Sequence, residues 1–187
     1  MIHGIGLRSL LIGLMLVLLS ACAEPQTFSI HDGLTDSDST KFQNIVSQFI
    51  IENGFGNHVI YFSSASNEAE NALRNGTVYM VHSANQPFIV ADGEKIRKAG
   101  NYFISKKLME DAPQVVSFLS KMHIDETIIA ECLQWAEDKG TDFDGAALYF
   151  LLNYQSKWST WIEEKTYQAA KKVLRAQISN SALKDEF

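Results

Sequence analysis

The first half of the chain switches repeatedly between the two-residue period of a strand and the three- to four-residue period of a helix. The patterns predict strands at residues 27–31, 58–63 and 78–82, with a second helix at 67–74. The helix between the first two strands has one buried face, because its apolar residues are spaced by three or four positions: Phe42, Ile45, Val46, Phe49 and Ile50. Asp38 or Ser39 is its expected N-cap, and Asn53-Gly54 its expected end.

In the remainder of the chain, the pattern of apolar and polar residues predicts mainly helices. We expect strands at 88–91 and 101–105 and a helix over 106–122. Three more helices are expected: one from an Asp125 cap to Gly140, one from an Asp142 or Asp144 cap to Tyr154, and one over residues 158–178.

This order of elements sets the fold class. Three strands joined by helices give right-handed crossovers and parallel pairing, with helices on both faces of the sheet. We therefore predict an α/β, three-layer fold with a mostly parallel sheet of about four or five strands and a helical C-terminal half.

The N-terminal residues are typical of an export signal. Arg8 precedes an apolar run, Leu10–Leu19, which is short of the about 20 residues that a spanning helix needs. The run ends in Leu19-Ser20-Ala21-Cys22, a bacterial lipobox, so lipid attachment is predicted at Cys22. The predicted divisions are a signal peptide at 1–21, a lipidated tether at 22–26 and one domain at 27–187. An ordinary signal peptide cleaved at Ala21 or Ala23, which leaves a free thiol, is the alternative.

A lipidated cysteine implies a place in the cell envelope. Several acyl chains hold a protein firmly to a membrane, at about 0.8 kcal/mol per buried CH2. Ala23 stands where an inner-membrane lipoprotein of a two-membrane envelope has aspartate, which favours the periplasmic face of the outer membrane.

Composition narrows the function. The formal net charge of −6 gives no electrostatic basis for binding nucleic acid, and 46% hydrophobic with 20% charged residues is typical of a globular domain. Cys132, Trp135, Trp158 and Trp161 fall in helical patterns, where core packing is the favoured interpretation. The histidines lack metal-ligand spacing, and no nucleophile motif or phosphate-binding glycine loop is present. We expect no catalytic set, metal or cofactor, and a binding protein rather than an enzyme.

The predicted topology also places a binding site. Ligands of open parallel sheets lie at the carboxyl ends of the strands. The polar residues that follow the predicted strands are the ligand-binding candidates: Asp32, Ser64, Ser66, Asn67, His82 and Asn85.

Several segments resemble a known family. They are Ile51–Gly56, Ala69–Val78, Phe103–Lys107, Asp111–Leu119, Glu131–Glu137, Phe143–Ala147 and Asn153–Trp161. Together they resemble the substrate-binding proteins of ABC importers for glycine betaine, choline and proline. The resemblance implies a periplasmic-binding-protein-like fold, a small-molecule ligand and an ABC permease as partner.

The departures from that family are specific. The third predicted strand is followed within a short stretch by the returning C-terminal segment, so one lobe of the family's two-lobed fold is expected. Glu70 stands where the resemblance would put a tryptophan of the aromatic ligand cage, and the amides Asn85 and Gln86 stand where a further one is usual. No aromatic residue of the family's ligand cage can be assigned to a position of this sequence.

Two functions follow. The first is a membrane-anchored solute-binding lipoprotein that acts with a permease and binds a small ligand without transforming it. The second is a one-lobe remnant that serves as a protein-interaction or sensor-accessory module in the envelope.

Overall fold

The protein is described here from a computed structural model, over residues 25–31, 37–62, 66–83 and 91–180. The predicted leader, Cys22 and most of the tether lie outside these residues, as do Asp32, Ser64, Asn85 and most of the strand expected at 88–91. Among the described residues, no helix has both the length and the apolar composition needed to cross a bilayer.

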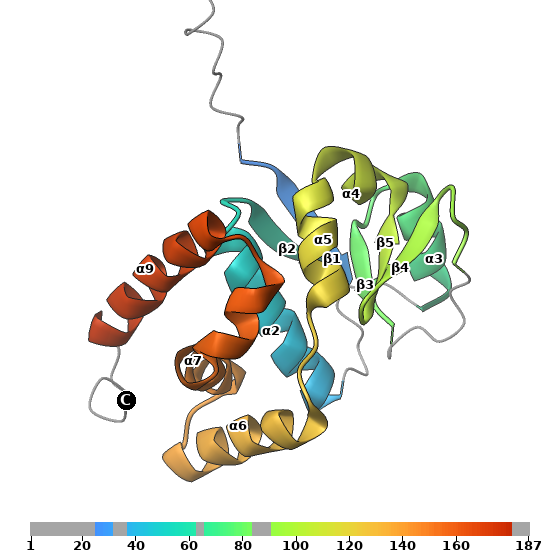
Figure 1. Ribbon diagram of the computed structural model, residues 1–187. Coiled ribbons are helices and arrows are strands. Elements are labelled where there is room, and N and C mark those ends of the chain that lie inside the picture. Colours follow the sequence, from blue (N-terminus) through green and yellow to red (C-terminus); the bar gives the residue numbers. More distant parts are fainter. Residues whose placement is uncertain (1–24, 32–36, 63–65, 84–90, 181–187) are drawn as a thin grey trace, which may run out of the picture.

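A five-stranded sheet forms one side of the fold (Figure 1). Its strand order is β2-β1-β3-β5-β4. The strands are β1 (Thr27–His31), β2 (His58–Phe62), β3 (Met80–His82), β4 (Ile96–Ala99) and β5 (Tyr102–Ser105). β1 pairs in parallel with β2 and β3, whereas β5 pairs antiparallel with β3 and β4.

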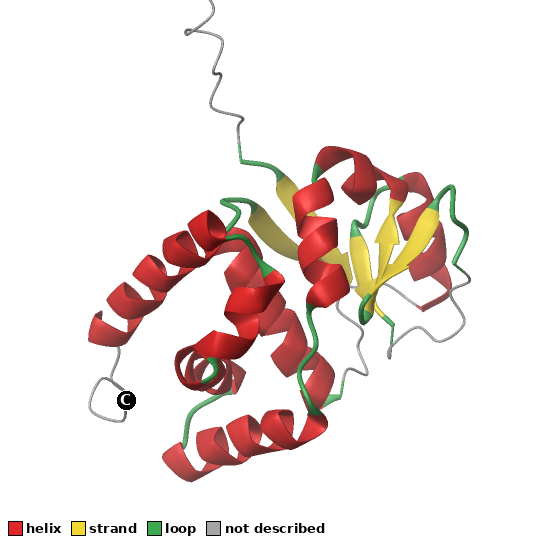
Figure 2. Cartoon of the chain, in the orientation of Figure 1, coloured by secondary structure: helices red, strands yellow, loops and turns green. Residues whose placement is uncertain are grey.

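Helices account for most of the remaining described residues (Figure 2). They are α2 (Asp38–Asn53), α3 (Ser66–Asn75), α4 (Lys106–Asp111), α5 (Pro113–Lys121), α6 (Glu126–Lys139), α7 (Phe143–Asn153), α8 (Gln155–Trp158), a 3-10 turn η1 (Ser159–Trp161) and α9 (Glu164–Asn180).

The inner strands β3 and β5 are buried on both faces of the sheet, so the predicted three-layer α/β class is confirmed. On one face, Ile30 and Ile104 join the large core formed with α2, α5 and the C-terminal helices. On the other, Val81 and Phe103 pack with Leu73 of α3 in a separate cluster. α6, α7 and α9 gather around α2 beside the sheet rather than on it (Figure 1).

The sheet is more evenly mixed than the predicted mostly parallel one. β4 and β5 are joined by the short turn Gly100-Asn101, and strands joined by a tight turn run antiparallel. β5 consequently runs antiparallel to β3. The predicted strand at 78–82 is also shorter, because the Val78 N–H donates to the carbonyl of Ala72 at the end of α3 instead of to a strand.

Three helix limits differ from the prediction for local reasons. Ser37, rather than Asp38 or Ser39, caps α2, because its Oγ accepts the Thr40 N–H at 3.2 Å. The helix predicted at 106–122 breaks at Ala112, since Pro113 disfavours a helical residue before it. The helix predicted at 158–178 begins at Glu164, because Ile162 is extended. The caps at Asp142 and Gly140 are as predicted.

Candidate functional site

A polar cleft opens where β3 ends. It has a volume of about 590 Å³, within the range of about 300–1,000 Å³ usual for small-molecule sites. Four parts of the chain meet there: the first turns of α2, the end of β3, the β4–β5 hairpin and the start of α6. The lining residues are Ser37, Ser39, Thr40, Gln43, His82, Ser83, Lys98, Asn101, Phe103 and Glu126.

One wall of the cleft is a buried polar face of α2. Thr40 and Gln43 are 1% and 4% exposed. The Gln43 amide is held from both ends: its Oε1 accepts from Asn101 Nδ2 at 2.9 Å, and its Nε2 donates to Ser39 Oγ at 3.3 Å. A buried amide fixed in this way is a preorganised hydrogen-bonding surface rather than a flexible one.

Tyr102 of β5 also holds α2 in place, through its hydroxyl group. Its hydroxyl lies 3.2 Å from Asn44 Oδ1, 3.2 Å from Ser47 Oγ and 3.3 Å from the Gln43 carbonyl. The Ser47 hydroxyl donates its own proton to the Asn44 carbonyl at 2.8 Å, which leaves the Ser47 oxygen as an acceptor. These bonds hold α2 against the sheet next to Gln43, which lines the cleft.

His82 ends β3 and forms part of the cleft wall. Its side chain is 3% exposed, and its ring meets that of Tyr102 edge to face at 5.1 Å between centroids. Burial lowers the pKa of His82 from 6.5 to about 4. The imidazole is therefore neutral near pH 7, and it adds polarity but no charge to the cleft.

The β4–β5 turn is held in place by backbone contacts. Asn101 contributes its carbonyl to the Ser83 N–H at 2.7 Å, which ties the turn to the end of β3. Gly100 has a φ of +58°, and a Cβ there would lie 2.2 Å from the carbonyl oxygen of Leu119 in α5. Only glycine fits this close approach, so Gly100 positions Asn101 against α2.

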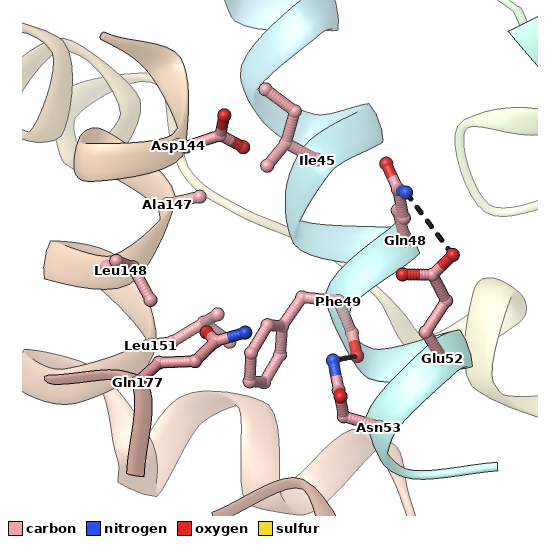
Figure 3. Close-up of a pocket in the computed structure, with 10 residues that line it drawn as sticks. All are labelled: Ile45, Gln48, Phe49, Glu52, Asn53, Asp144, Ala147, Leu148, Leu151 and Gln177. Atoms are coloured by element: carbon pink, nitrogen blue, oxygen red, sulfur yellow. Dashed lines mark hydrogen bonds between the residues drawn. The ribbon is translucent and has the colours of Figure 1, made fainter. Parts of the chain in front are cut away.

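A second hollow lies between α2, α7 and α9 (Figure 3). Its volume is about 240 Å³, and Phe49, Leu148 and Leu151 supply much of its lining. Polar groups along its α2 side are engaged within the helix, since Gln48 donates to Glu52 and Asn53 donates to the Phe49 carbonyl (Figure 3). It is smaller than usual ligand sites and resembles a crevice between packed helices.

Of the ligand-binding residues predicted from the sequence, some lie in the cleft and others do not. His82 lies in the cleft wall, while Ser66 and Asn67 are the first residues of α3. Asp32, Ser64 and Asn85 lie outside the described residues. Sequence reasoning missed most of the lining: Thr40, Gln43, Lys98, Asn101 and Glu126. The signal for the first two was a run of polar residues at helical spacing, opposite the apolar face of α2.

Residues that the sequence assigned to packing do pack. Trp158 and Trp161 are 0% and 5% exposed, and Trp135 stacks on Tyr149 at 4.6 Å while half-buried against the core. Cys132 is fully buried, and burial raises the pKa of its thiol to about 12. Glu70 forms a 2.7 Å ion pair with Arg74. Within the described residues, no group of three His, Cys, Asp or Glu side chains is arranged to hold a metal ion.

The fold is shared with a solved structure of known ligand. Neither a protein-family model nor a curated protein matches the sequence. A solved structure described as an ABC-transporter choline-binding protein in complex with choline superposes with a TM-score of 0.61 at 9% sequence identity. The match covers 79% of this chain and 98% of that chain. The chain thus has a substrate-binding-protein fold.

Proposed function

We propose that this protein is a solute-binding lipoprotein of the cell envelope, related to the binding proteins of glycine betaine, choline and proline importers. It binds a small polar solute in the cleft at the end of β3, leaves it chemically unchanged and delivers it to an ABC permease. The observation that carries the proposal is the buried, hydrogen-bonded polar wall of α2 on a fold shared with a choline-binding protein.

The physical case rests on the preorganised wall of the cleft. Gln43 and Thr40 are buried yet border an open volume, and the contacts of Asn101 and Tyr102 hold their helix in place. A wall ordered before the ligand arrives reduces the conformational entropy that binding must overcome. Core packing alone would favour apolar residues at these buried positions of α2.

Binding is tested by isothermal titration calorimetry on the full chain in detergent. The panel holds quaternary amines, proline and primary amino acids at millimolar concentration. At least one compound should bind, and Gln43→Leu should weaken that binding. Gln48→Leu is the matched control, because Gln48 lies on the same helix but lines the hollow of Figure 3. Absence of heat with every compound would overturn the proposal and favour the interaction module.

The anchor and its partner need separate tests. Cells fed an alkyne fatty acid should label the wild-type chain and not Cys22→Ser, and the labelled protein should sediment with outer membranes. The permease should co-purify with the wild-type protein after cross-linking in intact cells. Equal labelling of both chains would remove lipid on Cys22 from the proposal.

A further inference from the structure

Two opposite charges line the cleft. Lys98 comes from β4 and Glu126 from the first turn of α6, and both side chains are exposed. Among the described residues, neither forms an ion pair with another side chain. The cleft therefore offers one cationic and one anionic group to an occupant, among uncharged polar lining residues.

Aromatic surface is scarce in the same place. Among the described lining residues, Phe103 is the one phenyl ring, and it is 8% exposed because it packs under α3. A quaternary ammonium has no N–H group, so it depends on aromatic faces for cation–π attraction. The described wall offers it little such surface.

The wall is instead suited to N–H donors. The hydroxyl oxygens of Ser39 and Thr40 and the carboxylate of Glu126 are acceptors, and the last is charged. A primary ammonium carries three donors and bonds such groups well, since charge-assisted hydrogen bonds are about twice as strong as neutral ones. A carboxylate on the same solute would meet the ammonium of Lys98.

We infer that the cleft takes a zwitterionic α-amino acid with a primary ammonium, whose carboxylate faces Lys98 and whose ammonium faces Glu126. This inference rests on the proposed solute-binding function and narrows its ligand class. It sets this protein apart from the choline complex that shares its fold, because choline carries a quaternary ammonium.

Glycine and glycine betaine give a matched pair of probes, since the two differ only by three methyl groups on nitrogen. Calorimetry on the full chain would compare them together with choline, L-serine and L-glutamine. At least one of the three amino acids should bind about tenfold or more tightly than glycine betaine, because the methyl groups of glycine betaine remove the charged N–H donors that bond the wall. Equal or tighter binding of glycine betaine or choline would overturn the inference.

Substitutions at Lys98 and Glu126 test whether each charge contributes to amino-acid binding. Lys98→Met and Glu126→Gln should each lower amino-acid affinity about tenfold, whereas the matched controls Lys95→Met and Glu94→Gln should leave it unchanged. Lys95 and Glu94 are exposed in the preceding turn and do not line the cleft. Unchanged affinity in both cleft variants would overturn the inference.

The two proposals fail differently. If glycine betaine binds best and Gln43→Leu weakens it, solute binding stands and the amino-acid class falls. If no compound produces heat, both fall together.

Discussion

Asn101 donates a hydrogen bond from Nδ2 to Oε1 of Gln43 at 2.9 Å, across 58 positions of sequence. The bond joins the β4–β5 turn to the helix that follows β1, two elements with no local connection. Gln43 in turn donates to Ser39, so a single amide links the turn to the first turn of α2. The wall of the cleft therefore depends on a contact between distant parts of the chain.

This contact predicts an energetic coupling. Gln43→Ala and Asn101→Ala should each destabilise the protein, and the double variant should lose about 1 kcal/mol less than the sum of the two, because the shared bond is lost only once. Urea unfolding followed by tryptophan fluorescence measures all three. Strict additivity would show that the bond contributes nothing to stability.

Tyr102→Phe should lower the free energy of unfolding, because it breaks the contact between β5 and α2. Removal of the buried hydroxyl takes away the donor that Asn44, Ser47 and the Gln43 carbonyl share, and should cost about 1–3 kcal/mol. Tyr61→Phe is the control, because its hydroxyl donates to Gln48 at 2.9 Å in an exposed position and should change stability by about 0.5 kcal/mol or less. Similar losses in the two variants would contradict the assigned role of Tyr102.

The sequence predicted α2 well but assigned it one buried face. Phe42, Val46 and Ile50 mark the apolar face, and they are fully buried as expected. Gln43, Asn44 and Ser47 are buried too, on a polar face, because Tyr102 and the β4–β5 turn cover them. Composition cannot separate such a face from a solvated one, since the covering residues lie more than 50 positions away.

β4 shows a second reason why the sequence pattern did not predict part of the fold. Its residues Ile96 and Ala99 are buried while Arg97 and Lys98 are exposed, which is the three-residue spacing of a helix rather than the alternation of a half-buried strand. Only pairing with β5 establishes this strand. For the same reason, neither Lys98 nor Glu126 had a local signal that would place it at a cleft. His82 was accessible to sequence reasoning because it directly ends a predicted strand.

Gly100→Ala predicts a steric and conformational cost at the turn that carries Asn101. A methyl group would lie 2.2 Å from the Leu119 carbonyl oxygen at a φ of +58°, so α5 or the turn must move. The free energy of unfolding should fall by about 1–3 kcal/mol, and the midpoint of thermal unfolding should fall with it. Gly93→Ala is the matched control, since no atom lies within 4 Å of a Cβ at that position and its φ is not positive. Equal stability of the two variants would show that the approach of Gly100 to α5 is not tight.

The pH dependence of stability should report the burial of His82. Its pKa is about 4 in the folded protein and 6.5 when exposed, so the unfolded chain binds a proton between these values that the folded chain does not. Above pH 6.5 the residue makes no pH-dependent contribution. As pH falls from 6.5 to 4, it should remove about 3 kcal/mol of unfolding free energy, and below pH 4 the loss should level off.

The comparison with His82→Gln isolates this effect from other titrating groups, including Asp92 and Asp125, whose pKa values are lowered by hydrogen bonds to Arg74 and Lys157 respectively. The variant lacks the edge-to-face contact with Tyr102 and should be less stable at pH 7. Its deficit should shrink by about 3 kcal/mol between pH 6.5 and pH 4, because only the wild type bears the cost of keeping a buried imidazole neutral. Urea unfolding at half-unit intervals of pH measures the difference. A gap that stays constant across this range would show that the imidazole is accessible to protons in the folded state.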